Sequence, residues 1–285
     1  MNTVLPSRYS ESAHRLALGV EAIDAAREQP LLTPVMLTHD DAPLGNPRQP
    51  FLRHASNRQA LLYDAYYAPQ ARTVTLRLFD QVESLYSPDA DRRRFVPRRL
   101  QISLPTLAAA EAAAPAARGC RPHLFPAAAY PISQTVTGLR AHVMRAAAGA
   151  PPLPQQRPAR WARVWATVPS GQPLLTQSAV VARAMCDERG EFLLIVRHDP
   201  AALGVGSLLS VRLRVFAAAE AQPPNVSLPG LDPLWDAPIE TPASLADTDP
   251  VLRGEALPAG YAQVGERVVN LPLGRLLRGQ PVLLI

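Results

Sequence analysis

The sequence contains no lysine, so arginine supplies all 29 of its basic side chains. A GC-rich genome accounts for such a bias. The functional alternative is that guanidinium groups suit planar, bidentate contacts with other protein groups. Aromatic residues are also few, at 6% of the chain. They offer little material for the clustered aromatic surface on which single-stranded nucleic acids stack.

Only two cysteines are present, Cys120 and Cys186, and they have no CxxC spacing. Alone they cannot form a zinc site, and we interpret them as free thiols in a reducing compartment. No apolar run approaches the ~20 residues that span a bilayer. The first residues lack the basic region and apolar core of a signal peptide. We therefore expect a bacterial protein without a membrane span, located in the cytoplasm or in an assembled particle.

Catalytic motifs are missing as well. The six histidines are dispersed, and no pair has the i, i+4 spacing of a helical zinc site. No Walker loop, dinucleotide fingerprint or nucleophile elbow occurs. His39 beside Asp40 and Asp41 is an acid–base or metal candidate, but its place between prolines favours a solvated turn. The sequence therefore predicts no enzymatic activity, no metal and no cofactor.

The net charge of +5 and the pI near 9.7 allow nucleic-acid binding without requiring it. The compact basic cluster is Arg92–Arg99, and neither stacking aromatics nor a recognition helix accompanies it. This pattern favours a solvated loop or a patch that faces protein, with Arg93 and Arg94 as candidate contacts. Nucleic acid is not the expected partner.

What the chain does contain is proline and alternating strands. Its 31 prolines are about double the usual ~5%, and they favour short strands and loops over helices. Val74, Leu76 and Leu78 fall on one face of a predicted strand, and residues 99–104 repeat the period of two. We predict an N-terminal β-sandwich over residues 1–105. An Ala/Pro-rich linker, or a short helix that Pro115 ends, follows within residues 106–134.

A second unit is predicted over residues 135–218. Its strands include residues 161–168, where Trp161 and Trp165 are expected on one face, and the strand that begins at Phe192. The turn before that strand is the most informative feature of the chain. Asp187 can accept hydrogen bonds from nearby backbone groups, Gly190 permits a positive φ, and Phe192 is expected in the core.

This second unit resembles a carboxypeptidase regulatory-like domain, which has a transthyretin-like β-sandwich, over residues ~135–216. The resemblance rests on Gly138-Leu139-Arg140-Ala141, Ala162-Arg163-Val164 and Asp187-Glu188-Arg189-Gly190-Glu191-Phe192. Cys186 departs from the threonine or serine that usually precedes the aspartate. The resemblance implies a non-enzymatic module that spaces or docks other domains. Bacterial proteins of this type also look like accessory subunits of phage-tail-like contractile assemblies, which is an analogy of fold.

Residues 219–285 have many prolines and weak patterning, so we predict an extended proline-rich arm. Its apolar end, Leu283-Leu284-Ile285, is expected to complete a sheet of its own chain or of a neighbour. Trp235 lies within the arm in an anchor-like peptide, and docking on its own chain or on another are equal alternatives. For Trp161 and Trp165, core packing competes with a role as anchors for a partner.

The sequence therefore predicts an all-β protein with two antiparallel β-sandwich units of transthyretin or Ig-like type and a C-terminal arm. We expect a non-enzymatic structural or adaptor subunit of a bacterial multi-protein assembly, with a contractile injection machine as one possibility. Its partners would be protein subunits or further copies of the chain. A ligand- or carbohydrate-binding module and an unrecognised enzyme are the alternatives. The candidate protein-contacting residues are Arg93, Arg94, Trp161, Trp165, Trp235, Leu283, Leu284 and Ile285.

Overall fold

A computed structural model describes most of the chain, and every structural statement below concerns the residues that it describes. These are residues 15–32, 35–39, 51–55, 58–63, 71–80, 92–133, 135–146, 156–167, 180–197, 208–219, 234 and 236–284. Within them the protein is built of strands, and its α-helix, α1, has only six residues (Leu107–Ala112). The predicted all-β class is confirmed.

The strands are short in the first half of the chain and longer toward its C-terminus. In order they are β1 (Arg15–Glu21), β2 (Ile23–Asp24), β3 (Gln29–Pro30), β4 (Val35–His39), β5 (Phe51–Ala55), β6 (Arg58–Tyr63), β7 (Arg72–Asp80), β8 (Arg98–Leu104), β9 (Gly119–Cys120), β10 (His123–Leu124), β11 (Gly138–Ala146), β12 (Gln156–Pro158), β13 (Arg163–Thr167), β14 (Val180–Met185), β15 (Glu191–Ile195), β16 (Leu208–Ala218), β17 (Ile239–Glu240), β18 (Tyr261–Pro272) and β19 (Leu276–Leu284).

The first unit contains two four-stranded sheets, with strand orders β5-β6-β1-β9 and β17-β8-β7-β4, and a small sheet β10-β2-β3. The period-2 pattern places Val74, Leu76 and Leu78 in the core as predicted, since each is at most 3% exposed. β7 pairs with β8 in antiparallel register, Val74 opposite Ile102. Side chains from both four-stranded sheets share one hydrophobic cluster.

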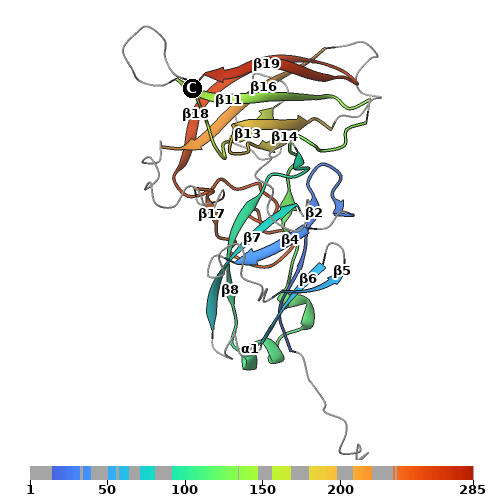
Figure 1. The fold of residues 1–285 in the computed structure, drawn as a ribbon, viewed down its shortest axis with the longest axis vertical. Coiled ribbons are helices and arrows are strands. Elements are labelled where there is room, and N and C mark those ends of the chain that lie inside the picture. The colour runs from blue at the N-terminus through green and yellow to red at the C-terminus, as the bar shows by residue number, and fades with distance from the viewer. Residues whose placement is uncertain are drawn as a thin grey trace, which may run out of the picture.

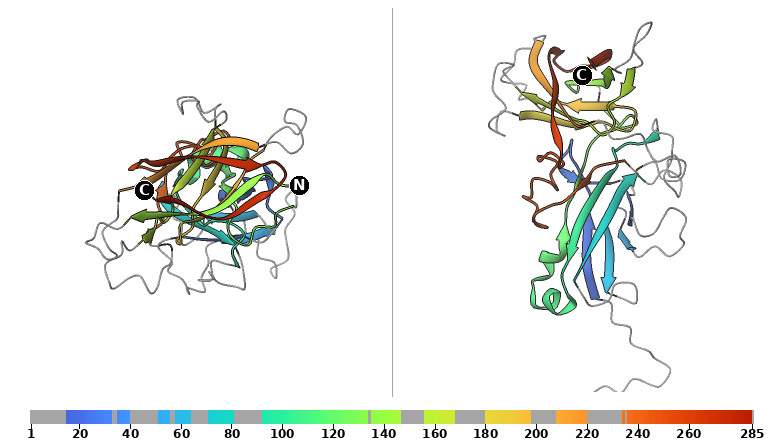
Figure 2. Two further views of the ribbon diagram at one scale, coloured as in Figure 1. Left: turned by 90° about the horizontal axis from the view of Figure 1, so that it is seen from above. Right: turned by 90° about the vertical axis from the view of Figure 1, so that its left-hand side faces the viewer.

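The second unit also has two sheets that share one hydrophobic cluster. One has the order β14-β13-β16-β18, and the other the order β12-β11-β15 with β19 paired to β11. The two units lie end to end along the long axis of the molecule, with β17 between them (Figure 1). Figure 2 shows the same stacking from two further directions.

The turn at Asp187 forms as the sequence predicts. The Asp187 Oδ1 accepts hydrogen bonds from the backbone N–H groups of Arg189 and Glu191, at 2.8 and 2.9 Å. Gly190 has a φ of +73°, and Phe192 is 1% exposed within the second core. The residue roles that the motif assigned to Asp187, Gly190 and Phe192 are confirmed.

The C-terminal region differs from the extended arm that the sequence led us to expect. β17 pairs in parallel with β8 of the first unit, β18 pairs along its length with β16, and β19 runs parallel to β11. The last two strands therefore add one strand to each of the two sheets of the second unit. Proline is compatible with this arrangement because Pro272 ends β18 and Pro281 lies in a strand with a partner on one side only.

The segment expected as a linker also contributes to the first unit. Thr106 caps α1 by accepting a hydrogen bond from the N–H of Ala109 at 3.2 Å. After α1, Pro115 opens a short 3-10 helix, η2 (Pro115–Arg118). β9 and β10 then pair in parallel with β1 and β2. This segment is therefore part of the first unit's sheets rather than a spacer.

We expect Gly190→Ala to lower the free energy of unfolding by about 3 kcal/mol or more. A Cβ at Gly190 would lie 2.4 Å from the carbonyl oxygen of Val143, in addition to the strain of its positive φ. The matched control is Gly260→Ala, because Gly260 has a φ of +79° and open space around it. The control should lose only the free energy that the strained positive φ costs a residue with a Cβ, about 1–2 kcal/mol. Urea denaturation of both variants measures the difference, and equal losses would contradict the packing argument.

Candidate functional site: the junction of the two units

Three buried charged residues meet where the two units join. Arg98 comes from β8 of the first unit, Arg163 from β13 of the second, and Glu240 from β17 in the C-terminal region. Their side chains are at most 4% exposed. The two carboxylate oxygens of Glu240 accept from Arg98 Nε at 3.0 Å and Nη2 at 2.9 Å. Arg163 Nη2 lies 3.1 Å from the Glu240 Oε1.

Arg98 uses the full donor set of its guanidinium group, which has five N–H bonds. Besides Glu240, it donates to the carbonyl oxygens of His123, Leu252 and Val251 at 2.7, 2.9 and 2.6 Å. These acceptors belong to β10 and to the turn that follows β17. One buried side chain therefore fixes three chain segments.

The charge balance stabilises the ionised form of Glu240. Burial alone raises the pKa of its carboxyl group, but the neighbouring Arg98 and Arg163 outweigh burial and hold the pKa below its usual value. Burying an ion pair costs desolvation energy, which close pairing and hydrogen bonds offset. With two guanidinium groups around one carboxylate, the network has a surplus of positive charge.

A small hydrophobic cluster also contains residues of both units. It contains Phe79, Val96 and Phe125 from the first unit, Trp161 and Met185 from the second, and Leu234 and Ala237 from the C-terminal region. Trp161 is 2% exposed, and its indole N–H donates to Asp236 Oδ1 at 2.8 Å. The units are thus joined by a packed core as well as by charge.

The two tryptophans do not share the one strand face that the sequence predicted. β13 begins at Arg163, and Trp161 lies in the preceding turn with a φ of +58°. Trp165 lies within β13, where its ring contacts that of Phe216 in a tilted arrangement, 4.9 Å between centroids, and the Arg183 guanidinium group lies over it. Both side chains pack within this chain, so neither is an exposed anchor here.

Part of the arginine cluster also turns inward. Arg93, 2% exposed, forms an ion pair with Glu188 in the turn of the second unit. Arg99 donates to the carbonyl oxygens of Leu234 and Ala237, at 3.3 and 3.0 Å. Arg93 and Arg99 therefore contact the second unit and the C-terminal region of the same chain, whereas Arg92 and Arg94 are exposed to solvent.

The remaining candidates are partly outside the described residues. Trp235, Ile285, Asp40 and Asp41 lie outside them, and His39 is the last residue of β4. Leu283 and Leu284 lie in β19, where their backbone pairs with Val143 and Met144 of β11. Both cysteines are free and buried, and burial raises the pKa of the Cys120 thiol to about 12.

Sequence reasoning did not identify Arg98 or Glu240 as key residues. They are 142 positions apart, and neither belongs to a recognisable motif. The available signal was local: Arg98 and Arg99 stand at the start of the alternating segment, and Ile239-Glu240 interrupts a proline-rich stretch. Neither pattern reveals that the two residues pair.

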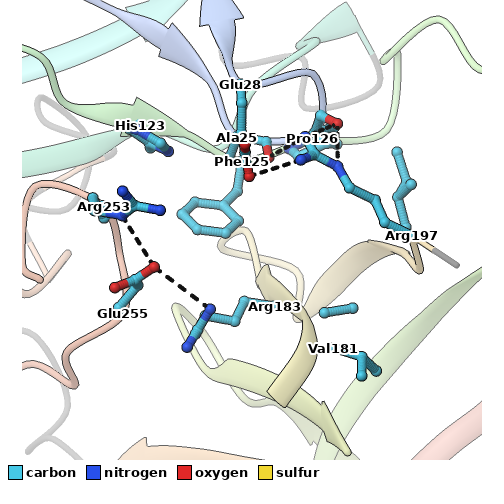
Figure 3. Close-up of a pocket in the computed structure, with 13 residues that line it drawn as sticks. Ala25, Glu28, His123, Phe125, Pro126, Val181, Arg183, Arg197, Arg253 and Glu255 are labelled. Carbon is cyan, nitrogen blue, oxygen red and sulfur yellow. Dashed lines mark hydrogen bonds and ion pairs between the residues drawn. The ribbon is translucent and has the colours of Figure 1, made fainter. Parts of the chain in front are cut away.

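Among the described residues, two cavities are considered as ligand sites. An apolar groove of about 440 Å³ lies in the first unit, where Gly19, Ala60 and Gly119 form part of its wall. A polar cavity of about 110 Å³ lies at the junction, between His123, Arg183 and Arg253 (Figure 3). No group of three or more His, Cys, Asp or Glu side chains suited to a metal ion is found in the described ranges. No helix in them is long and apolar enough to cross a membrane.

Comparison with known proteins assigns no family. No protein-family model matches the chain, and no curated protein matches it.

Glu240→Gln should lower the free energy of unfolding by about 3–5 kcal/mol, because it leaves Arg98 and Arg163 buried beside a neutral amide. The control is Glu266→Gln, since Glu266 is 46% exposed and pairs with Arg212 at the surface. Such exposed pairs contribute about 0–1 kcal/mol. Denaturant titration at neutral pH compares the two variants.

The same network predicts an acid-sensitive junction. The folded pKa of Glu240 lies below its unfolded value, so its stabilisation is present above the unfolded pKa of ~4.3. It is lost as the pH falls through the folded pKa. Unfolding free energies measured between pH 7 and pH 3 should fall less steeply in Glu240→Gln than in the wild type. Identical slopes would show that Glu240 does not couple to protons.

Proposed function

We propose that the protein is a non-enzymatic structural or adaptor subunit of a bacterial multi-protein assembly. In this proposal both units are β-sandwiches, the second is of the carboxypeptidase regulatory-like type, and the assembly is a phage-tail-like contractile injection machine. The partners are protein subunits or further copies of the chain. The subunit resides in the cytoplasm or in the assembled particle.

The observation that carries this proposal is the outer edge of β18, with which no strand of the described part of the chain pairs. This strand has 12 residues and pairs with β16 on one side, and it is the last strand in the order β14-β13-β16-β18. Along it, Val268 is 49% exposed, and Leu208 at the start of the neighbouring β16 is 65% exposed. Long edge strands with exposed apolar side chains are templates for pairing with another chain.

The junction supports the same proposal. A buried ion network and a shared hydrophobic cluster join the two units, which favours a subunit that holds a fixed spacing. The turn at Asp187 supports the carboxypeptidase regulatory-like interpretation, because its three signature residues have the structural roles that the resemblance implies.

Val268→Lys tests the proposal. A lysine on the edge strand should block strand addition, so the variant should lose self-association or capture of partner subunits. Its free energy of unfolding should stay within about 0.5 kcal/mol of the wild type, because the side chain is exposed. The matched control is Leu32→Lys, an exposed leucine (85%) in the first unit, which should assemble normally.

The measurement is the mass of each purified protein in solution and of the complexes it recovers from its native lysate. A wild type that stays monomeric and recovers no partner overturns the adaptor proposal. Assembly that survives Val268→Lys rules out the β18 edge as the contact. Deletion of residues 222–285 is not a usable alternative, because it removes β17, β18, β19 and Glu240 together.

The apolar groove favours ligand binding as a second candidate function. Its volume of about 440 Å³ lies in the range of small-molecule sites. Gly119 pairs with Gly19, which pairs with Ala60, so three residues with little or no side chain lie side by side across the sheet. The lining contains no aromatic residue, which argues against a carbohydrate, and its small and apolar residues are bordered by the charged Glu21, Arg58, Arg121 and Asp247. An unrecognised enzyme remains the third alternative, with no residue group to support it.

Ala60→Leu should fill this groove and reduce the fluorescence gain of anilinonaphthalene sulfonate, an anionic dye whose aromatic rings fluoresce when they bind apolar surfaces. Ala262→Leu, the same change at an exposed position on β18, is the control and should leave dye binding unchanged. Dye binding that is equal in both variants and the wild type would contradict a ligand role for the groove.

A further inference from the structure

The polar cavity at the junction is built from all three parts of the chain. His123 and Phe125 line it from the first unit, Arg183 from β14 of the second unit, and Arg253 and Glu255 from the turn after β17. Figure 3 shows the side chains of Arg183, Arg253 and Glu255 approaching one another, with His123 on the same side as Arg253. The volume of about 110 Å³ holds several water molecules but not a nucleotide.

The charges around the cavity do not cancel. Arg197 is neutralised by Glu28 at 2.7 Å, and it also donates to the carbonyl oxygen of Ala26 at 3.0 Å. The other two guanidinium groups share one carboxylate: Arg253 lies 3.0 Å from Glu255, and Arg183 lies 3.8 Å from it. One positive charge therefore remains without an equal counter-charge.

Arg183 carries this surplus. Its side chain is 18% exposed, and its Nε–H is buried without a hydrogen-bond acceptor. The distance of 3.8 Å to Glu255 is too long for a hydrogen bond, while its guanidinium group lies over the Trp165 ring at 5.5 Å. Burial lowers the pKa of Arg183, in keeping with a guanidinium group that is partly removed from water. An anion with several acceptor oxygens would satisfy it.

We propose that this cavity binds a small tetrahedral oxyanion, phosphate or sulfate, between Arg183, Arg253 and His123. Guanidinium groups pair with such anions by charge-assisted hydrogen bonds, and a neutral histidine can donate one further N–H. Because these three residues come from the two units and the C-terminal turn, the bound anion fastens the junction. This site is separate from the β18 edge, so it does not rest on the proposed assembly function.

The test is isothermal titration calorimetry of inorganic phosphate and of sulfate into the full-length protein, in chloride-free buffer of matched ionic strength. Wild type should bind one anion. Arg183→Gln should weaken binding at least about tenfold, since one charged bidentate contact is lost. The matched control is Arg212→Gln: Arg212 also has a buried Nε without an acceptor and pairs with Glu266 outside the cavity. It should bind as the wild type does.

Glu255→Gln should change the anion affinity in the opposite direction to Arg183→Gln. Removing the competing carboxylate frees Arg183 and Arg253, so this variant should bind the anion more tightly than the wild type. Absence of binding in the wild type, equal affinity in Arg183→Gln, or weaker binding in Glu255→Gln would each overturn the proposal.

The pKa of the His123 imidazole tests whether the anion binds in this cavity. Burial first, and then the positive charges of Arg253 and Arg98, lower the pKa of His123 to about 4, against the opposing effect of Glu28 and Glu255. Arg183 and Arg197 also line the cavity, from the second unit. A bound oxyanion should raise this pKa, as followed by proton NMR with His123→Gln to assign the signal. Anion binding that leaves the His123 titration unchanged would place the anion elsewhere and overturn the assignment.

Discussion

The buried pairing of Glu240 with Arg98 and Arg163 is the constraint on which the rest of this structure depends. Each charge is costly to bury alone, and removing one partner leaves the others uncompensated. The three residues come from the first unit, the second unit and the C-terminal region. The charges are therefore balanced only where all three parts come together. Because Arg98 also binds carbonyl oxygens of residues 251 and 252, the C-terminal turn is held at the same point.

This constraint explains why the C-terminal region is not an arm. After it reaches β17 beside β8, the chain must return to the second unit, where β18 and β19 extend one sheet each. The second core thus includes Leu271 from the end of β18, together with residues of β11 and β13. Strands that are last in sequence complete sheets that began far earlier. Such non-local pairing makes folding slow in general, because loop closure precedes the contacts that compensate for it.

What the sequence predicted well was local. The alternation in β7 and the turn formed by Asp187 and Gly190 depend on neighbouring residues only, and both form as expected. Trp161 shows the limit of this reasoning, because its positive φ removes it from the strand that the pattern suggested. The burial of Arg93 and Arg98 was not predictable either. A run of arginines is typical of a solvated surface, and only pairing with Glu188 and Glu240, both distant in sequence, makes its burial possible.

At the junction, arginine makes contacts that lysine could not make. Arg98 satisfies a carboxylate and three carbonyl oxygens at once, which requires the planar five-donor fork of guanidinium. A lysine ammonium has three donors and could not reach this acceptor set. A junction fixed in this way gives the two units one relative orientation, so the β18 edge has a defined direction with respect to the first unit.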